Sequence, residues 1–302
     1  MDSKPTQIIT ASRRLVVIQR NPTSGSGKGR KELRELISEL RTVGLKVRLF
    51  ASRERLDTYV NSQEVAGQVR CLVAAGGDGT VGSLVNRHPG FPIATLPLGT
   101  ENLVARHLGI ARDGRALAQL IAQGRTRRFD VGDANGTTFL LMASVGVDSD
   151  VVRRLHESRR GNIRHLSYLK PIIQSFCRFN YPLLTVCDSA GEVVATGSHV
   201  IATNIPEYGF RMPFSPDSDP HDGLVDVRVF QKTGLIATVF HAVKTRLGMK
   251  ENPQEVCRLV MREVEIKSTS DLTPCQCDGD PVSDCPVKIK VKPDAMTLVI
   301  AD

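Results

Sequence analysis

The residues best suited to chemistry lie in one glycine-rich loop, which reads Gly76, Gly77, Asp78, Gly79 and Thr80. The apolar run before it, Leu72–Ala75, predicts a buried strand, and Thr80 is a candidate cap for a helix that follows. Glycine lets backbone N–H groups approach a ligand closely, and a helix N-terminus attracts anions. The carboxylate of Asp78 would repel a bare phosphate unless a divalent cation lay between them. The loop therefore predicts a site for a metal–nucleotide.

Two other phosphate-binding motifs are excluded by their context. The segment Gly77–Gly82 matches the dinucleotide pattern G-x-G-x-x-G, but that pattern normally opens the first strand–helix unit and needs an acidic residue after the next strand. Here it follows the third predicted strand, and Glu101 lies in a loop before a helix. A P-loop over Gly25–Gly29 would need glycine at position 22 and Ser or Thr at position 29, where the chain has Pro22 and Gly29.

Two further loops carry hydroxyl, amide and glycine donors. The first follows a strand-like run, Leu15–Gln19, and offers Asn21, Thr23, Ser24 and Gly25. The second follows the run Phe91–Leu96 and offers Thr100 and Asn102, for which simple helix capping is the structural alternative. Ligands of parallel sheets bind at the carboxyl ends of the strands, so three such loops predict one shared site.

The elements that position these loops alternate between strand and helix. A strand at Lys46–Ala51 joins the three already named, and helices are predicted over Lys31–Thr42, Arg53–Ala66 and Leu103–Leu108. This alternation predicts a parallel sheet covered by helices.

The pattern changes after about Arg127. A hairpin is predicted over Phe129–Val145, and a helical segment runs to about Phe179. Strand-like runs separated by turns follow at Leu183–Cys187, His199–Thr203, Leu224–Phe230, Val256–Met261, Val264–Ser270, Val287–Val291 and Thr297–Ile300. The second half is therefore predicted to be a mainly antiparallel β domain.

Composition limits the partners. The chain has 302 residues and no run of 18 apolar residues, and its seven cysteines come without a predicted export signal. We therefore expect a soluble cytoplasmic protein with reduced thiols. A net charge of +8 suits phosphate-bearing ligands or an anionic membrane surface, whereas 5% aromatic residues supply few stacking platforms for nucleic acid.

The ordered set of motifs resembles one family. Asn21-Pro-Thr-Ser-Gly, Gly76-Gly-Asp-Gly-Thr, Pro97-Leu-Gly-Thr-x-Asn102, Asp222-Gly-Leu-x-Asp-Val and Asp278-Gly-Asp280 resemble, in this order, the diacylglycerol kinase catalytic-domain family, in particular its stand-alone bacterial-type lipid kinases. The similarity runs from about Leu15 to Ile300. It implies an α/β nucleotide-binding domain over residues 1–130 and a β-sandwich lipid-substrate domain over 131–302, with residues 292–302 returning to the first domain and the active site in a cleft between the two.

The same resemblance implies the cofactors and the site residues. ATP and Mg²⁺ are expected in the three loops, with Ser52 as a further candidate for nucleotide contact. The catalytic base is expected at Asp280, with Asp278 as its partner or in the reverse role, and Asp148 is expected to support them. The family carries Glu where this chain has Asp280, and the chain also departs from it at Gly82, Ser83 and Leu103. A structural Mg²⁺ is expected on the Asp222 side chain and the main chain of Asp219 and Leu224.

The sequence leaves several alternatives open. The acceptor is diacylglycerol or a related lipid at an anionic membrane surface, and peripheral binding at the inner membrane surface and a homodimer are both compatible with it. A sphingosine-type kinase, an NAD kinase that shares Gly76–Thr80, and a non-catalytic nucleotide- or lipid-binding relative are the other readings. The basic residues Arg153, Arg154, Arg159, Arg160 and Arg164 form either a solvated face or, with the apolar residues that follow, a membrane contact.

Overall fold

The computed structural model describes residues 5–22, 29–157, 169–208, 212–231 and 252–301, together with scattered positions between 234 and 249. Backbone contacts divide the chain into two compact units. The first unit comprises the chain up to Phe129 and the C-terminal segment from Asp294 onward, and the second unit is Asp130–Pro293. The chain passes from one unit to the other within two long strands, β6 (Arg125–Ala134) and β19 (Val287–Val299).

The first unit is built on a parallel sheet in the order β5-β4-β2-β3, with the end of β19 beside β5. Its strands are β1 (Gln7–Ile8), β2 (Leu15–Arg20), β3 (Lys46–Phe50), β4 (Val69–Gly76) and β5 (Ile93–Pro97). Its helices are α1 (Arg30–Thr42), α2 (Arg53–Val60), α3 (Gln63–Ala66), α4 (Asp78–Arg87), α5 (Leu103–His107) and α6 (Gly114–Gln123). Every residue of β4 is buried, as the apolar run Leu72–Ala75 predicts.

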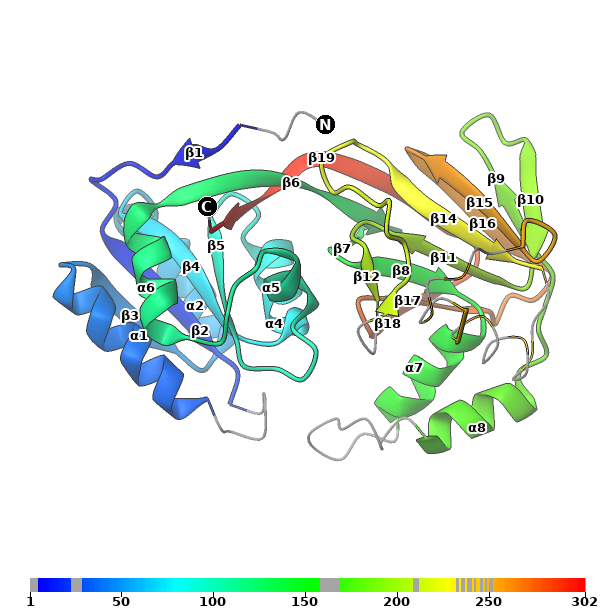
Figure 1. The fold of residues 1–302 in the computed structure, drawn as a ribbon, viewed down its shortest axis with the longest axis horizontal. Helices are drawn as coiled ribbons and strands as arrows, with labels where there is room; N and C mark the ends of the chain where they lie inside the picture. The colour runs from blue at the N-terminus through cyan, green and yellow to red at the C-terminus, as the bar shows by residue number, and fades with distance from the viewer. Residues whose placement is uncertain are drawn as a thin grey trace. The chain divides into compact units, whose positions relative to one another are not determined.

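Helices α1 and α6 lie side by side against this sheet (Figure 1). The face of α1 that is buried carries Leu33, Leu36 and Leu40, which recur at helical spacing and join the core formed with β2, β4 and β5. The contact between the helices is close at Gly114, where an added methyl group would lie 2.0 Å from the Glu32 carbonyl oxygen. The two helices therefore pack too closely for a side chain at position 114.

The second unit contains two antiparallel sheets, one in the order β10-β9-β16-β19 and the other β15-β14-β11-β8-β17-β18. A shared core draws apolar side chains from both sheets, including Val186 and Ile266 of the first and Val200 and Val227 of the second. The unit is therefore a β-sandwich. Its strands are β7 (Thr137–Phe139), β8 (Met142–Val145), β9 (Leu184–Cys187), β10 (Val193–Gly197), β11 (His199–Thr203), β12 (Glu207–Tyr208), β13 (Met212–Pro213), β14 (Val225–Phe230), β15 (Val256–Met261), β16 (Glu263–Ser268), β17 (Pro274–Cys277) and β18 (Asp280–Asp284).

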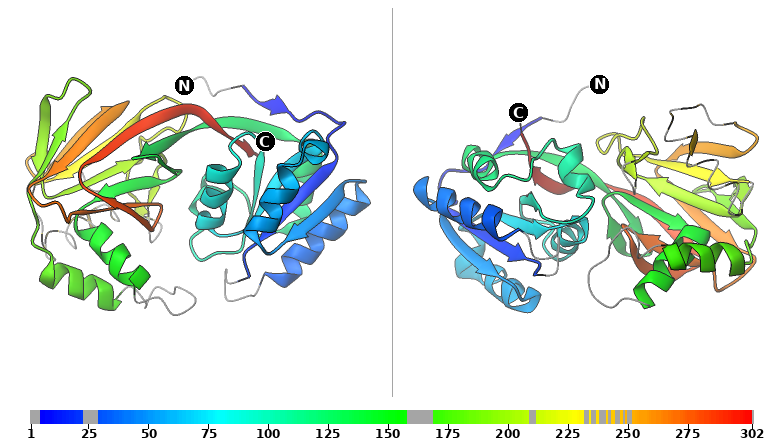
Figure 2. Two further views of the ribbon diagram at one scale, coloured as in Figure 1. Left: turned by 180° about the vertical axis from the view of Figure 1, so that it is seen from behind. Right: turned by 60° about the horizontal axis from the view of Figure 1, so that its bottom comes forward.

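Two helices, α7 (Val147–Glu157) and α8 (Leu169–Arg178), pack against each other, and α7 also packs on β17 and β18 (Figure 2, green). No described helix is long and apolar enough to cross a membrane. All seven cysteines are unbridged.

The predicted α/β fold with a parallel-sheet first domain and an antiparallel second domain is confirmed, with local differences. The helix predicted over Arg53–Ala66 is two helices, and α6 lies in a stretch for which no element was predicted. The second strand of the predicted hairpin, Thr138–Val145, is two strands in different sheets. The predicted strands Val287–Val291 and Thr297–Ile300 instead form one continuous strand, β19, which ends at Val299. The prediction of Thr80 as a helix cap is wrong: α4 begins at Asp78 and its cap is Gly77, in an extended conformation.

Candidate active site

Two of the three predicted loops meet through their glycines in the first unit. A methyl group added at Gly99 would lie 2.6 Å from the Gly77 Cα, and one added at Gly77 would lie 3.2 Å from the Gly99 Cα. The first contact is too short for a side chain at Gly99 unless the backbone shifts, and the second leaves little room for one at Gly77. The Leu98 N–H also donates to the Gly76 carbonyl at 2.8 Å. The backbone of the Gly76–Thr80 loop is therefore held against the loop after β5.

The third loop reaches the same place through Asn21. Its backbone N–H donates to the Ala75 carbonyl at 3.1 Å, and its Nδ2 lies 3.5 Å from the Thr80 Oγ1. Thr80 is buried in the first turn of α4, and an added methyl group at Gly76 would lie 2.2 Å from its hydroxyl. Thr23, Ser24 and Gly25 lie outside the described residues.

Asn102 organises its own loop. Its Oδ1 accepts from the Gly99 N–H at 2.8 Å, and its Nδ2 donates to the Gly99 carbonyl at 3.0 Å. It stands at the start of α5 in a left-handed conformation and makes no side-chain cap there. Thr100 is exposed at the tip of the loop. Helix capping was the structural alternative for Thr100 and Asn102, but the start of α5 is capped by another side chain.

That side chain is Asp78. Its Oδ1 accepts from the Val104 N–H at 3.0 Å, so the carboxylate caps α5 while its main chain opens α4. Burial raises the pKa of Asp78 and the negative charge of Glu101 raises it further, whereas hydrogen bonds from the Val104 and Leu103 N–H groups and from its own amide lower it. A cation beside this carboxylate would offset the cost of burying its charge. Ser52, the further candidate for nucleotide contact, instead caps α2 by accepting from the Arg55 N–H at 3.2 Å.

In the second unit, Asp278 and Gly279 form the two-residue turn between β17 and β18, both with positive φ, of 51° and 88°. This is the geometry for which Asp-Gly is favoured. The Asp278 carboxylate accepts three main-chain hydrogen bonds, from Leu140, Leu141 and Met142, at 2.7, 2.9 and 3.0 Å. It therefore ties the turn to the segment that leads into β8.

Asp280 differs from Asp278 in its surroundings. Its side chain is 66% exposed, and its Oδ1 lies 3.9 Å from the His156 Nδ1 on α7. Of the two carboxylates, Asp280 is the one open to a substrate from solvent.

The predicted supporting residue, Asp148, belongs to a buried polar cluster. It accepts from the Ser144 hydroxyl at 2.6 Å and pairs with the His199 Nε2 at 2.8 Å. Ser144 and His199 were not identified from the sequence, since they are single polar residues in apolar strands and carry no motif.

The predicted metal loop is tied down by two carboxylates. Asp222 Oδ1 accepts from the Leu224 N–H at 2.8 Å, and Asp130 Oδ2 accepts from the Gly223 N–H at 2.7 Å. Burial raises the pKa of Asp222, and the negative charges of Asp219, Asp226 and Asp130 raise it further, against the Leu224 hydrogen bond. An oxygen-rich, mutually repelling donor set of this kind fits a hard cation such as Mg²⁺.

No three described His, Cys, Asp or Glu side chains are placed to share a metal ion. The predicted site depends on one side chain, that of Asp222, and on the main-chain carbonyls of Asp219 and Leu224. Of the five arginines considered for a solvated face or a membrane contact, Arg153 and Arg154 form ion pairs with Asp150 at 2.7 and 2.6 Å. Arg159, Arg160 and Arg164 lie outside the described residues.

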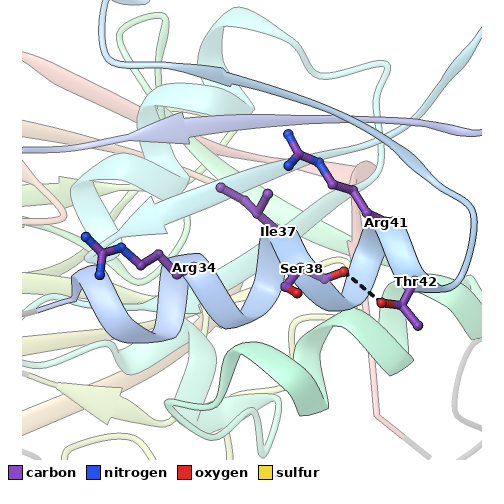
Figure 3. Close-up of a pocket in the computed structure, with 5 residues that line it drawn as sticks. All are labelled: Arg34, Ile37, Ser38, Arg41 and Thr42. Atoms are coloured by element: carbon purple, nitrogen blue, oxygen red, sulfur yellow. Dashed lines mark hydrogen bonds between the residues drawn. The ribbon is translucent and has the colours of Figure 1, made fainter.

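A surface pocket lies along α1, away from this chemistry. It is lined by Arg34, Ile37, Ser38, Arg41 and Thr42, all from that helix (Figure 3). The Thr42 hydroxyl is engaged with the Ser38 carbonyl at 3.2 Å. None of the five residues belongs to the predicted site.

Comparison with known proteins agrees with the two units. The family model described as diacylglycerol kinase catalytic domain matches residues 14–134, and the one described as YegS C-terminal NAD kinase beta sandwich-like domain matches residues 142–300. A Klebsiella pneumoniae protein named "Probable lipid kinase YegS-like" is 26% identical, with 90% of this chain and 92% of that protein covered. A Mycobacterium tuberculosis protein named diacylglycerol kinase is also 26% identical, with 92% and 93% covered.

Solved structures share the fold. A Bacillus anthracis protein described as a diacylglycerol kinase gives a TM-score of 0.71 at 20% identity, with 97% of this chain and 98% of that one covered. Yeast NADH kinase gives a TM-score of 0.57 at 12% identity, with 99% and 90% covered. From the two matching models, which together span residues 14–134 and 142–300, the chain belongs to the diacylglycerol kinase catalytic-domain family and carries the YegS-type C-terminal domain.

Proposed function

We propose that this chain is an ATP- and Mg²⁺-dependent lipid kinase that transfers the γ-phosphate of ATP to the hydroxyl of diacylglycerol or a related lipid. The observation that carries the proposal is the meeting of the Gly77 and Gly99 backbones beside the start of α4. Glycine loops at the carboxyl ends of neighbouring parallel strands let backbone N–H groups approach a phosphate chain closely.

The nucleotide phosphates would be bound by the main chain of Gly76–Thr80 at the N-terminus of α4. Asn21, just after β2, supports this loop through its contact with Thr80. Asn102 holds the loop after β5, and the exposed Thr100 would contact the nucleotide. By the same proposal Thr23, Ser24 and Gly25 complete the nucleotide contacts.

Mg²⁺ fits two places. Bound beside Asp78 with the nucleotide, it would neutralise charge on the phosphates during transfer. In the second unit, Asp222 would hold a structural Mg²⁺ with the carbonyls of Asp219 and Leu224, which would relieve the repulsion among the neighbouring carboxylates.

The proton of the acceptor hydroxyl would be taken by Asp280. Its exposure supports this assignment, because a base must reach the substrate. Asp278 would hold the turn through its three main-chain hydrogen bonds, and Asp148 would support it from the adjoining cluster.

The lipid would be met at an anionic membrane surface, which the net charge of +8 favours, by a cytoplasmic protein that binds the inner surface peripherally. A homodimer is compatible with this proposal.

The experiment that tests the proposal incubates purified protein with ATP labelled at the γ-phosphate, Mg²⁺ and one acceptor at a time: diacylglycerol, sphingosine or NAD. Labelled lipid is the expected product. Label on NAD, or no transfer to any acceptor while ATP still binds, would contradict a lipid kinase and would favour an NAD kinase or a non-catalytic sensor.

A further inference from the structure

The Asp278-Gly279 turn, which leads into Asp280, is also held by a buried glutamine. Gln276 lies in β17, two residues before Asp278, and is 3% exposed. Its Oε1 accepts from the Gly279 N–H at 2.8 Å. That N–H belongs to the peptide that joins Asp278 to Gly279, so the hydrogen bond fixes the plane from which the chain continues into Asp280.

The other end of the Gln276 amide is also engaged. Its Nε2 donates to the Ser144 Oγ at 2.8 Å, and Ser144 is fully buried. The Ser144 hydroxyl has one proton, which it donates to Asp148 Oδ2 at 2.6 Å. The Ser144 oxygen is left as an acceptor for the glutamine, and this settles which end of the amide faces Gly279.

These contacts form one directed chain of hydrogen bonds. The Gly279 N–H donates to Gln276, Gln276 donates to Ser144, and Ser144 donates to the Asp148 carboxylate, which is also paired with His199 at 2.8 Å. Ser144 and Gln276 are 132 positions apart in sequence and become neighbours because β8 pairs with β17.

Without this chain, the hydrogen bonds that tie the turn to β8 and the segment before it are those of Asp278. The Asp278 carboxylate accepts from the N–H groups of Leu140, Leu141 and Met142, and the Asp278 N–H donates to the Met142 carbonyl at 3.0 Å. Gly279, in contrast, has φ of 88° and no side chain, and an added methyl group there would meet nothing within 4 Å. Gly279 would then be held only through its neighbours Asp278 and Asp280, of which Asp280 pairs with Cys277 across the turn, and glycine is the residue with the greatest backbone freedom.

We propose that Gln276 is a positioning residue, which transmits the fixed orientation of Asp148 and Ser144 to the Gly279 peptide and so sets the direction of the Asp280 carboxylate. The inference rests on the proposed function, in which Asp280 takes the proton of the acceptor hydroxyl. A displacement of about 1 Å at a reacting group can cost on the order of 10²-fold in rate. Gln276 touches no reacting atom and acts only through the turn.

Three variants separate this role from general stability. Gln276→Met keeps the length of the side chain and removes both hydrogen bonds. Ser144→Ala keeps the bond from Gln276 to Gly279 but removes the partner that orients the amide. Thr273→Val is the matched control: Thr273 is 1% exposed in the same unit, and its hydroxyl donates to the Ser270 carbonyl at 2.8 Å and lies 2.6 Å from the Ser268 Oγ, outside this chain of hydrogen bonds.

The readouts are steady-state lipid phosphorylation and hydrogen exchange of the Gly279 amide. We expect Gln276→Met to lower kcat about 10- to 100-fold with the KM for ATP unchanged, and to speed Gly279 exchange at least tenfold. Ser144→Ala should change both in the same direction by less, and Thr273→Val should match the wild type in both.

Each other result decides against the proposal. Unchanged exchange in Gln276→Met would show that the glutamine does not hold the turn, and faster exchange with kcat unchanged would show that the reaction does not depend on it. Equal losses in Thr273→Val would show that the effect is one of core stability. If the wild type phosphorylates no lipid, the proposed function fails and the role toward Asp280 falls with it, while exchange still reports whether Gln276 holds Gly279.

Discussion

The main chains of Gly77 and Gly99 pack directly against each other, so that a methyl group added at Gly99 would lie 2.6 Å from the Gly77 Cα and 2.8 Å from the Asn102 Oδ1. The loop after β4 is thus positioned by the loop after β5, and by the hydrogen bonds through which Asn102 closes that second loop.

Gly99→Ala should separate the two loops. Overpacking of this kind costs roughly 1–3 kcal/mol, so we expect a lower melting temperature and at least a tenfold loss of ATP affinity, measured by calorimetry. Gly90→Ala is the control, because an added methyl group there meets nothing within 4 Å. Unchanged ATP affinity in Gly99→Ala would contradict the assignment of these loops to the nucleotide.

Asp78→Asn should abolish Mg²⁺-dependent transfer and leave the fold intact, because the amide oxygen of asparagine can still accept from the Val104 N–H. Turnover at the wild-type rate would remove Asp78 from the site.

The same variant has a predicted pH dependence in the absence of Mg²⁺. Since the pKa of Asp78 is higher in the folded protein than its ordinary value, the folded protein binds that proton more tightly than the unfolded chain does. The stability from this group is present at low pH and is lost as pH rises from the ordinary value through the raised one. The melting temperature of Asp78→Asn minus that of the wild type should therefore increase across this window, and a constant difference would contradict the effect of burial.

Asp222→Ala should remove the stabilisation that added Mg²⁺ gives to the wild type, with a smaller effect on ATP binding. Asp188→Ala is a matched control, because Asp188 caps another turn by accepting from the Ala190 and Glu192 N–H groups, both at 2.9 Å. We expect Asp188→Ala to keep the Mg²⁺-dependent rise in melting temperature. The same rise in Asp222→Ala would show that the loop is only a turn.

Asp278→Asn should be destabilised. An asparagine offers one acceptor oxygen where the carboxylate serves three main-chain N–H groups, and each buried donor left unpaired costs about 1–3 kcal/mol. Asp284→Asn, on the same hairpin with a side chain 42% exposed, should melt like the wild type. Equal melting temperatures for both variants would contradict the anchoring role of Asp278.

The parts of the site that depend on residues close together in the sequence could be predicted from it. An apolar run followed by Gly76–Thr80 marks a strand end and a phosphate loop, and Asp278-Gly279 marks a hairpin turn, because each depends on neighbours in the chain. The cap of α5 by Asp78 and the three bonds to the Asp278 carboxylate depend on residues up to 138 positions away. Gln276 was missed for the same reason, although a glutamine in a strand of otherwise buried apolar residues is a signal of a buried polar contact.

The most direct test of the lipid kinase assignment measures phosphate transfer from γ-labelled ATP to diacylglycerol in anionic vesicles by the wild type, Asp280→Asn and Asp280→Glu at saturating ATP. We expect labelled lipid from the wild type, lost when Mg²⁺ is chelated. The rate should fall by roughly 10²–10⁴-fold in Asp280→Asn, the usual worth of a general base. It should be retained or raised in Asp280→Glu, while all three proteins bind ATP equally. No labelled lipid from the wild type, or an equal rate from Asp280→Asn, would contradict the account.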